Sequence, residues 1–175
     1  MALPVPKARY TFADCLTWGE DERIEIINGE AVMMAPPTRI HQEISGELFR
    51  QLANFLDGKK CKVYAAPFAV RLFEKEGDTP DDVDTMVEPD ISVVCDHDKL
   101  DEHGCKGAPD LVVEILSPST QRHDRLVKLD LYQRAGVREY WIVSPNEKAV
   151  HVFLLDGGLM QPHEVYGKED IAKVN

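Results

Sequence analysis

Two short and almost entirely apolar runs limit what this chain can fold into more than any other feature of its sequence. They are Ile91–Cys95 and Leu111–Leu116. Apolar runs without polar alternation are typical of strands that are buried on both faces of a sheet. Because such strands need a layer on each side, the sequence predicts an α/β fold in which a mixed β-sheet is flanked by helices.

The helices that would cover this sheet can be located from the spacing of apolar residues. A helix is expected over 38–56, with apolar side chains recurring on one face. That face is formed by Ile40, Ile44, Leu48, Leu52 and Phe55. A second helix is expected over 119–135 and ends at Gly136, a residue that readily closes a helix. A short helix is expected over 11–16.

The rest of the pattern indicates strands. Arg23–Ile27 and Glu30–Met34 flank Asn28-Gly29, a dipeptide that suits a hairpin turn because both of its residues readily take positive φ. An exposed loop is expected over 74–82, which has no apolar pattern. A chain of 175 residues fits one domain, so we expect a single domain over 1–175. The remaining strands are expected at 62–66, 68–73, 139–143, 149–155 and 160–166.

The charge of the chain bears on its partners. The formal net charge is −11 and the pI is about 4.9, which is unfavourable for a protein that attracts phosphates through a basic surface. The acidic residues are concentrated in Glu74–Glu88, however, and basic residues gather at Lys59–Lys62 and Arg122–Arg138. Because binding depends on local patches, this distribution weakens the objection to a nucleic-acid ligand without removing it.

The sequence also indicates a compartment. No apolar run approaches the roughly 18–20 residues needed to cross a bilayer, so we expect no membrane association. The segment Met1–Lys7 lacks the long apolar core of a signal peptide, and we expect a cytoplasmic protein. None of the four cysteines forms a Cys-x-x-Cys pair, and reduced thiols are the expectation for a chain with a substantial core.

Two carboxylates stand out in the apolar runs. Glu114 lies inside the second run, where a charge is costly unless it is paired or bound to a metal. Asp90 precedes the first run and follows Pro89, which marks a strand edge. The 24 positions from Asp90 to Glu114 allow a strand, a loop and a returning strand, so the two side chains are expected to meet. Asp110 is the weaker partner, because four residues along one strand separate Cα atoms by roughly 13 Å.

Paired carboxylates of this kind suit the hydrolysis of phosphodiesters. Mg²⁺ ions held by carboxylates neutralise the phosphate charge and activate a water molecule, and a nearby lysine can stabilise the developing charge. The common position for that lysine, two residues after the glutamate, is Leu116 here. Lys128 on the following predicted helix is the candidate replacement, with Asp124 one turn before it.

Segments spread over nearly the whole chain form a recognisable pattern. They are Ile24–Glu30, His41, Val87–Val94, Gly107–Thr120, Asp124 with Lys128, and Gly136–Val143. This pattern resembles the Uma-two family of restriction-endonuclease-like proteins, a branch of the PD-(D/E)XK nuclease superfamily. The longest of these segments is specific, whereas the histidine and the Asn-Gly turn alone are weak signals.

The resemblance implies a restriction-endonuclease-like core and the activity of a metal-dependent endonuclease that acts on DNA. It implies that Asp90 and Glu114 bind Mg²⁺ or Mn²⁺ and that Lys128 is the displaced catalytic lysine. Glu25 and His41 are then residues at the edge of the site. The resemblance also implies a homodimer.

Two other functions stay open at this point. One is a catalytically silent binding or regulatory module that keeps the nuclease scaffold, which the acidic composition favours. The other is a metal-dependent phosphoesterase with a small substrate. A zinc site is a further, weaker alternative, because Cys95-x-His97 and His103-x-Cys105 contain suitable ligand types without a standard spacing.

Each candidate residue also has a purely structural interpretation. Asp90 and Glu114 can form a hydrogen-bonded pair at strand ends, and Lys128 can be a solvated helix lysine. Glu25 alternates with isoleucines and can point to water, while His41 can cap or pair locally at the start of its helix. The aromatic residues are expected in the core or at a dimer contact. They are Tyr132, Tyr140, Trp141 and Phe153.

Overall fold

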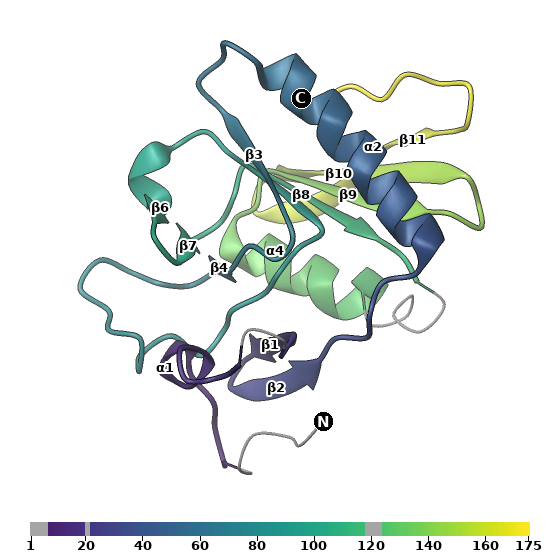
Figure 1. Cartoon of the computed structure of the whole chain (residues 1–175). Coiled ribbons are helices and arrows are strands. Elements are labelled where there is room, and N and C mark those ends of the chain that lie inside the picture. The colour runs from purple at the N-terminus through teal and green to yellow at the C-terminus, as the bar shows by residue number, and fades with distance from the viewer. Residues whose placement is uncertain (1–6, 20–21, 118–123) are drawn as a thin grey trace.

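A six-stranded sheet forms the centre of the molecule (Figure 1). The computed structural model describes residues 7–19, 22–117 and 124–175. Strand order is β11-β10-β9-β8-β5-β3, with β8 and β9 parallel and every other neighbouring pair antiparallel, so the predicted mixed sheet is confirmed. The strands are β3 (Lys62–Ala65), β5 (Ile91–Val94), β8 (Leu111–Ile115), β9 (Glu139–Ser144), β10 (Ala149–Asp156) and β11 (Leu159–Tyr166).

The two apolar runs become the central strands β5 and β8, and every residue of both strands is buried. Alternate residues of β8 enter two separate cores, as expected for a strand with both faces covered. Val112 packs with Leu131 of the helix on one face. Val113 packs with Leu52 of the helix on the other face. The prediction of strands buried on both sides is therefore confirmed.

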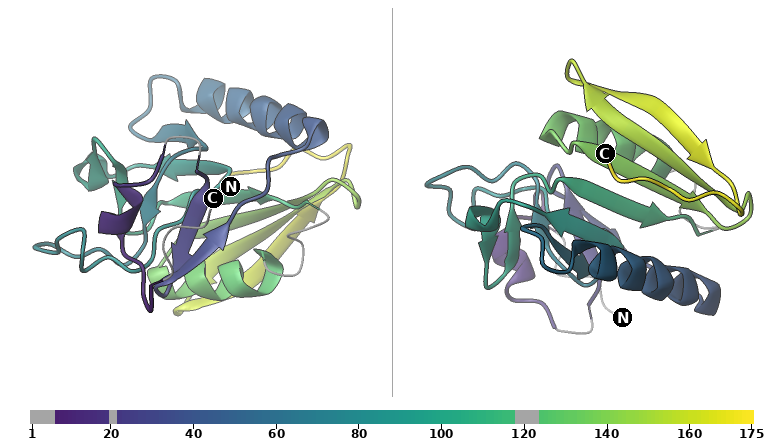
Figure 2. Two further views of the ribbon diagram at one scale, coloured as in Figure 1. Left: turned by 60° about the horizontal axis from the view of Figure 1, so that its bottom comes forward. Right: turned by 90° about the horizontal axis from the view of Figure 1, so that it is seen from above.

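Helices cover the two faces (Figure 2). Helix α2 (Arg39–Leu56) is capped by the Thr38 side chain, which accepts a hydrogen bond from the His41 amide. Helix α4 (Leu129–Ala135) covers the opposite face and ends at Gly136 in the left-handed conformation, as predicted. It follows a π-helical turn, η2 (Asp124–Lys128), where the sequence pattern predicted a regular helix. The predicted start of that helix at Ser119 lies outside the described residues.

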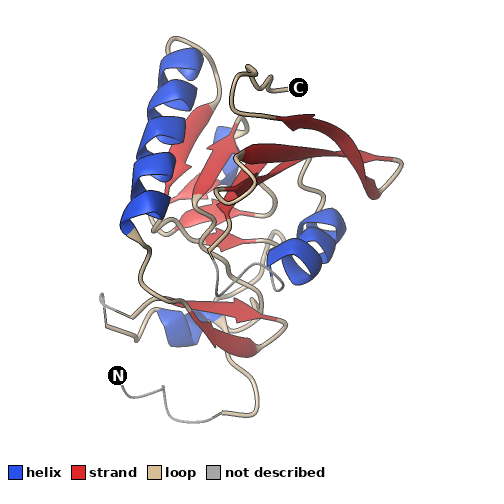
Figure 3. Ribbon diagram, turned by 90° about the vertical axis from the view of Figure 1, so that its right-hand side faces the viewer, coloured by secondary structure: helices blue, strands red, loops and turns tan. Residues whose placement is uncertain are grey.

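The predicted N-terminal hairpin lies beside the start of α2 (Figure 3). It consists of β1 (Ile24–Ile27) and β2 (Glu30–Met33), and Asn28 and Gly29 take φ values of 52° and 85° in the turn. All four residues of β1 are buried, because the strand packs against other elements on both sides, including a bridge from Ile26 to Met86. The short helix α1 (Phe12–Cys15) precedes the hairpin.

A small three-stranded sheet was not predicted. It contains β4 (Val70–Arg71), β6 (Leu100–Asp101) and β7 (Gly104–Lys106), with the 3-10 turn η1 (His97–Lys99) beside them. The prediction of one strand over 68–73 was wrong in extent, because only β4 forms there and it joins this second sheet. Strands of two or three residues carry no periodicity that a sequence pattern could reveal.

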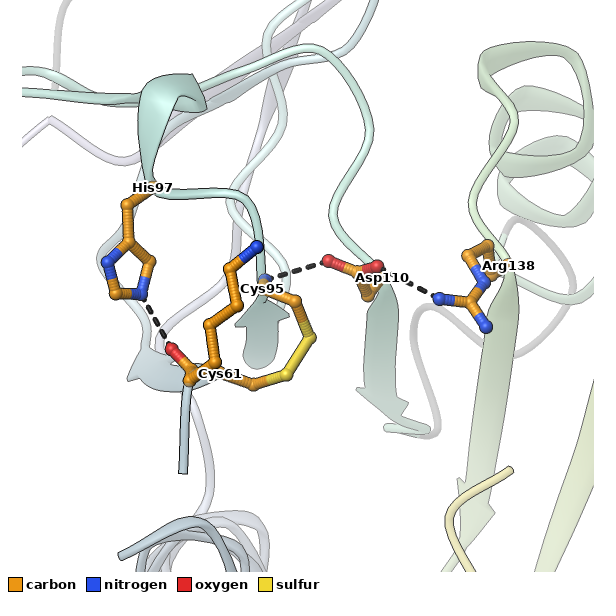
Figure 4. The surroundings of a disulfide bond; sticks show 6 residues. Cys61, Cys95, His97, Asp110 and Arg138 are labelled. Atoms are coloured by element: carbon orange, nitrogen blue, oxygen red, sulfur yellow. Dashed lines mark hydrogen bonds and ion pairs between the residues drawn. A yellow bond between two sulfur atoms is a disulfide. The ribbon is translucent and has the colours of Figure 1, made fainter. Parts of the chain in front are cut away.

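The expectation of reduced thiols is wrong for one pair of cysteines. Cys61 and Cys95 form a disulfide with their Cα atoms 3.9 Å apart (Figure 4). The register of β3 and β5 pairs Lys62 with Val94, so the two cysteines lie opposite each other at the next position. Their separation of 34 residues matches no short cysteine motif, and only the strand pairing brings them together. Cys15 and Cys105 are free thiols.

Within the described part of the chain, no helix combines the length and apolarity that crossing a bilayer requires.

Candidate active site

Four polar side chains from distant parts of the chain meet in the core beside β8. The Lys128 Nζ donates hydrogen bonds to Glu114 Oε1 at 2.8 Å and to Glu25 Oε1 at 3.0 Å. The Tyr132 hydroxyl donates to the same Glu114 oxygen at 2.6 Å. These residues belong to β1, β8, η2 and α4, so the cluster exists only where the hairpin, the central sheet and the second helix come together.

Lys128 is buried where neighbouring apolar residues are exposed, which is the reverse of the usual burial pattern of a helix. Its exposed fraction is 3%, whereas those of Leu126 and Val127 are 65% and 39%. Burying a lysine while leaving two apolar residues in solvent is unfavourable unless the ammonium is paired. Lys128 is therefore not a solvated helix lysine, because the two buried carboxylates of Glu25 and Glu114 hold it inside.

Glu25 likewise does not point to water. The side chain is buried, and its Oε1 also accepts a hydrogen bond from the Glu88 amide at 2.9 Å. The regular alternation of the strand suggested a solvated glutamate, but β1 is covered on both faces. Its alternate positions therefore do not separate core from solvent.

Asp90 lies next to this cluster. The register of β5 and β8 pairs Ile91 with Val113, so the next position places Asp90 opposite Glu114, as the sequence predicted. Its Oδ2 accepts a hydrogen bond from the Ile115 amide at 2.7 Å and lies 3.1 Å from His41 Nε2. His41 thus reaches across from α2 to orient this carboxylate.

Asp110, the weaker candidate, has a different place. Its Oδ2 accepts a hydrogen bond from the Cys95 amide at 2.8 Å, and its Oδ1 lies 3.3 Å from Arg138 Nη1 (Figure 4). It therefore joins neighbouring strands at the Cys95 end of β5, while Asp90 precedes the other end of that strand.

Burial changes the protonation of several groups near the site. Burial, and then the charge of Glu114, raises the pKa of Tyr132 well above its usual value, so the phenol stays protonated and donates. The hydrogen bond to Asp90 raises the pKa of His41. Burial raises the pKa of the Glu88 carboxyl, against the opposing effect of Arg23.

The donor set suits a hard, hydrated cation. Asp90 and Glu114 offer carboxylate oxygens from adjacent strands, and Mg²⁺ is often bound by one or two carboxylates with waters completing its shell. In the described residues, both contacts of Asp90 fall on Oδ2, so Oδ1 can face a metal. No group of three or more His, Cys, Asp or Glu among those residues forms a ready cluster for a metal. The oxygens that Asp90 and Glu114 offer fit a two-carboxylate site.

The zinc alternative does not agree with the structure. Cys95 is bonded to Cys61 and cannot act as a thiolate ligand. His97 Nε2 lies 2.7 Å from the Lys60 carbonyl oxygen (Figure 4). Two of the four proposed ligands are thus engaged elsewhere.

Two residues of this region were missed or misassigned from the sequence. Tyr132 was expected only as a core or dimer contact, although its spacing of four from Lys128 places both on one helical face. Arg23 was noted only as the start of a strand, but its Nη2 lies 3.4 Å from Glu88 Oε2 beside the site. The predicted contribution of Asp124 rests on a side chain outside the described part of the structure.

The relation of this chain to known proteins follows from its sequence and its fold. A family model described as "Putative restriction endonuclease" matches residues 12–175. The chain belongs to the Uma2 family. The family predicted from the sequence is therefore confirmed.

This Uma2 chain is also similar to individual proteins. It is 29% identical over 141 residues to "Uncharacterized protein slr1290" of Synechocystis sp., which covers 79% of this chain and 70% of the relative. Its structure is similar to a crystal structure described as "a putative nuclease belonging to DUF820" from Anabaena variabilis, with a TM-score of 0.73 and 20% identity. That similarity covers 95% of the Uma2 chain and 89% of the other chain, and it confirms the predicted fold.

Proposed function

We propose that this chain is a metal-dependent endonuclease that hydrolyses phosphodiester bonds in DNA, and that residues 1–175 form one nuclease domain. Membership of the Uma2 family supports a nuclease-like function. The observation that supports metal-dependent cleavage of DNA is the position of Asp90 opposite Glu114, with the buried ammonium of Lys128 2.8 Å from Glu114 Oε1. Two carboxylates and a lysine in one place are what phosphodiester hydrolysis with Mg²⁺ requires.

Each residue has a defined role in this proposal. Asp90 and Glu114 would hold Mg²⁺ or Mn²⁺, which when bound neutralises phosphate charge and lowers the pKa of a water molecule. Lys128 stabilises the negative charge that develops on the phosphate, and Glu25 orients its ammonium. His41 orients Asp90 through its contact with Oδ2.

Tyr132, which the sequence did not indicate as a site residue, is a positioning residue for Glu114. Its hydroxyl and the Lys128 ammonium both bond Glu114 Oε1, and together they fix the plane of that carboxylate. The phenol stays protonated because burial raises the pKa of Tyr132 well above its usual value, so it remains a hydrogen-bond donor to Glu114.

The oligomeric state belongs to the same proposal. Cleavage of both strands of a duplex is served by two centres, and the family resemblance implies a homodimer. We therefore propose a dimer as the form that makes double-strand breaks, while a monomer would nick. Sedimentation of the protein with and without a duplex tests this separately from catalysis.

A plasmid assay tests the proposed activity. Wild type should convert supercoiled plasmid to nicked and linear forms with Mg²⁺ or Mn²⁺ and not with chelator. Glu114→Gln should lose about 10²-fold or more of the rate, because the neutral amide is a weaker metal ligand and a poorer partner for Lys128. Asp110→Asn is the matched control and should keep the activity, since the amide oxygen can still accept from the Cys95 amide. Equal cleavage by wild type and Glu114→Gln would refute catalysis at this site.

Two observations keep a silent binding module as a second candidate. The net charge is −11, and Lys128 already compensates Glu114, one of the two carboxylates that a metal would otherwise neutralise. Calorimetry with Mg²⁺ separates the candidates, because a silent module gives no binding heat in the wild type. Activity on nucleotide diesters but not on plasmid would instead indicate a small-substrate phosphoesterase.

A further inference from the structure

A small pocket lies directly beside Asp90 and has no role in the chemistry described above. Its volume is about 170 Å³, several times the ~30 Å³ that one water molecule occupies in the liquid. Arg23, Asp90 and the first turns of α2 contribute to its lining. It therefore adjoins the candidate catalytic centre and shares two residues with it, Asp90 and His41.

Two of the residues that line the pocket have a buried polar atom without a partner among the described residues. Arg23 Nε and His41 Nδ1 make no hydrogen bond to any residue that the structure describes. Buried polar atoms in proteins are nearly always satisfied, so two such atoms in residues that line one pocket favour a ligand or ordered water beside them. Arg23 Nε is always a donor, whereas His41 Nδ1 donates or accepts according to the protonation of its ring. Arg23 alone therefore indicates that the ligand carries hydrogen-bond acceptors.

The chemistry of this pocket favours an anion with several oxygens. Arg23 is held loosely, since its Nη2 lies 3.4 Å from Glu88 Oε2 and 31% of its side chain is exposed. Its guanidinium can therefore turn to present N–H donors to a phosphate. Gln42 and Ser45 also line the pocket, and Gln42 lies at the end of the first turn of the 18-residue helix α2, near its positive end.

Asp90 opposes an anion in this place unless its charge is compensated. A cation held by Asp90 and Glu114 supplies that compensation, so occupation of the pocket should depend on a divalent metal. We propose that the pocket is a subsite for a phosphate group of the nucleic-acid strand next to the scissile one, with Arg23 as its principal ligand. This inference rests on the proposed nuclease function, because the shared Asp90 makes the two phosphates neighbours.

The test measures oligonucleotide binding with Ca²⁺ in place of Mg²⁺, so that cleavage does not interfere. Fluorescence anisotropy is recorded for short duplexes that carry a single neutral methylphosphonate at successive positions, and for duplexes with or without a 5′-phosphate. Wild type should lose about tenfold to a hundredfold in affinity when one phosphate beside the cleavage position is made neutral. Arg23→Gln should bind more weakly by a similar factor and be insensitive to that same substitution.

The control is Arg39→Gln, which removes an equal charge near the start of the same helix. Arg39 pairs with Glu43, its side chain is 76% exposed, and it does not line the pocket. It should lower affinity only slightly and leave the response to each methylphosphonate unchanged. Arg23→Lys keeps the charge without Nε and should be intermediate, and it replaces Arg23→Gln if that variant fails to fold.

The outcomes distinguish the source of the phosphate and the fate of each proposal. A loss at an internal position that disappears with Arg23→Gln supports a backbone phosphate, and an Arg23-dependent gain from the 5′-phosphate supports a terminal one. If neither effect depends on Arg23, or if binding is the same in chelator, the subsite is refuted. Plasmid cleavage without an Arg23-dependent phosphate refutes the subsite alone, while Arg23-dependent binding without cleavage refutes the nuclease alone.

Discussion

At the scale of single residues, Lys128 compensates two buried carboxylates at once. Its Nζ lies 2.8 Å from Glu114 Oε1 and 3.0 Å from Glu25 Oε1, and all three side chains are buried. Removing one partner of a buried ion pair is far more damaging than replacing the whole set with apolar groups, because the remaining charge is left without compensation. The same residue is thus important for stability and for the proposed chemistry.

Lys128→Met should lower the free energy of unfolding by about 3–5 kcal/mol, since it leaves Glu25 and Glu114 facing each other in the core. Urea unfolding of the metal-free protein measures this. The matched double variant Lys128→Met/Glu25→Gln should recover part of the loss, because one of the two uncompensated carboxylates is then replaced by a neutral amide. An unchanged unfolding midpoint for Lys128→Met would show that this cluster is not a buried ion pair.

The His41–Asp90 contact predicts a pH dependence of stability. The hydrogen bond to Asp90 raises the pKa of His41 above its ordinary value of 6.5, while burial and Arg23 oppose the shift. A group whose pKa is raised on folding stabilises the folded state fully below its unfolded pKa, and this contribution is lost as the pH rises through the folded pKa. The difference in stability between wild type and His41→Asn should therefore be largest in mild acid and shrink as the pH increases.

Urea unfolding at a series of pH values, in chelator, measures that difference. The control is His163→Asn, which alters an exposed histidine on β11. A gap between wild type and His41→Asn that is constant over the whole series would contradict the proposed linkage.

The sequence predicted five candidate residues, and the structure brings all of them into one region. Asp90 and Glu114 were recognisable because charges next to or inside apolar strands are unusual. Tyr132 was not recognisable, because a tyrosine on the apolar face of a helix has an ordinary role in packing. The contact of Glu25 with Lys128 spans 103 positions, and no local pattern reveals such a pairing.

At the scale of secondary-structure elements, helix ends and glycines show how local sequence sets the backbone. Gly136 closes α4 at φ 86°, whereas Gly46 lies within α2, and in both cases an added Cβ would meet no atom within 4 Å. The two positions therefore differ in backbone conformation and not in available space.

Alanine at these two glycines should have opposite effects on stability. Gly136→Ala should destabilise the protein by about 1–2 kcal/mol, because an L-residue is strained in the left-handed region. Gly46→Ala should stabilise it by about 0.5–1 kcal/mol, because glycine lowers the stability of a helix interior. Thermal unfolding of both variants measures the difference, and the same sign for both would contradict the assigned backbone geometry.

The elements marked by strong periodicity or by a continuous apolar run were predicted almost to the residue. They include α2, the β1–β2 hairpin, and strands β5, β8, β9, β10 and β11. The small sheet of β4, β6 and β7 was missed because its strands are too short for a pattern. The π-helical turn before α4 was missed because its sequence reads as an ordinary helix, while the burial of Lys128 with its two carboxylates sets its orientation.

At the scale of the whole molecule, the disulfide between Cys61 and Cys95 ties β3 to β5 across 34 positions of sequence. A link of this kind restricts the unfolded chain, and loops of this size correspond to about 3–4 kcal/mol in the chain-entropy model. The pair also joins the edge strand of the central sheet to the strand that Asp90 precedes. Its contribution should therefore be seen in the stability of the entire fold.

Reduction should lower the melting temperature of the wild type. The double variant Cys61→Ser/Cys95→Ser should melt at the lower temperature with or without dithiothreitol, because it has no bond to reduce. Cys15→Ser is the control and should respond to reductant as the wild type does. Identical melting of oxidised and reduced wild type, with the bond confirmed by mass spectrometry, would refute this role.

The first hairpin has a consequence for how the chain should be divided in experiments. It contributes no strand to the central sheet, and by topology alone it would be taken for an optional attachment. Yet it supplies the second counterion of the buried ammonium through Glu25, and its first strand follows the arginine of the neighbouring pocket. A fragment trimmed to the main sheet and its two covering helices would thus keep the scaffold but lose Glu25 and Arg23 from the region in which the chemistry is proposed.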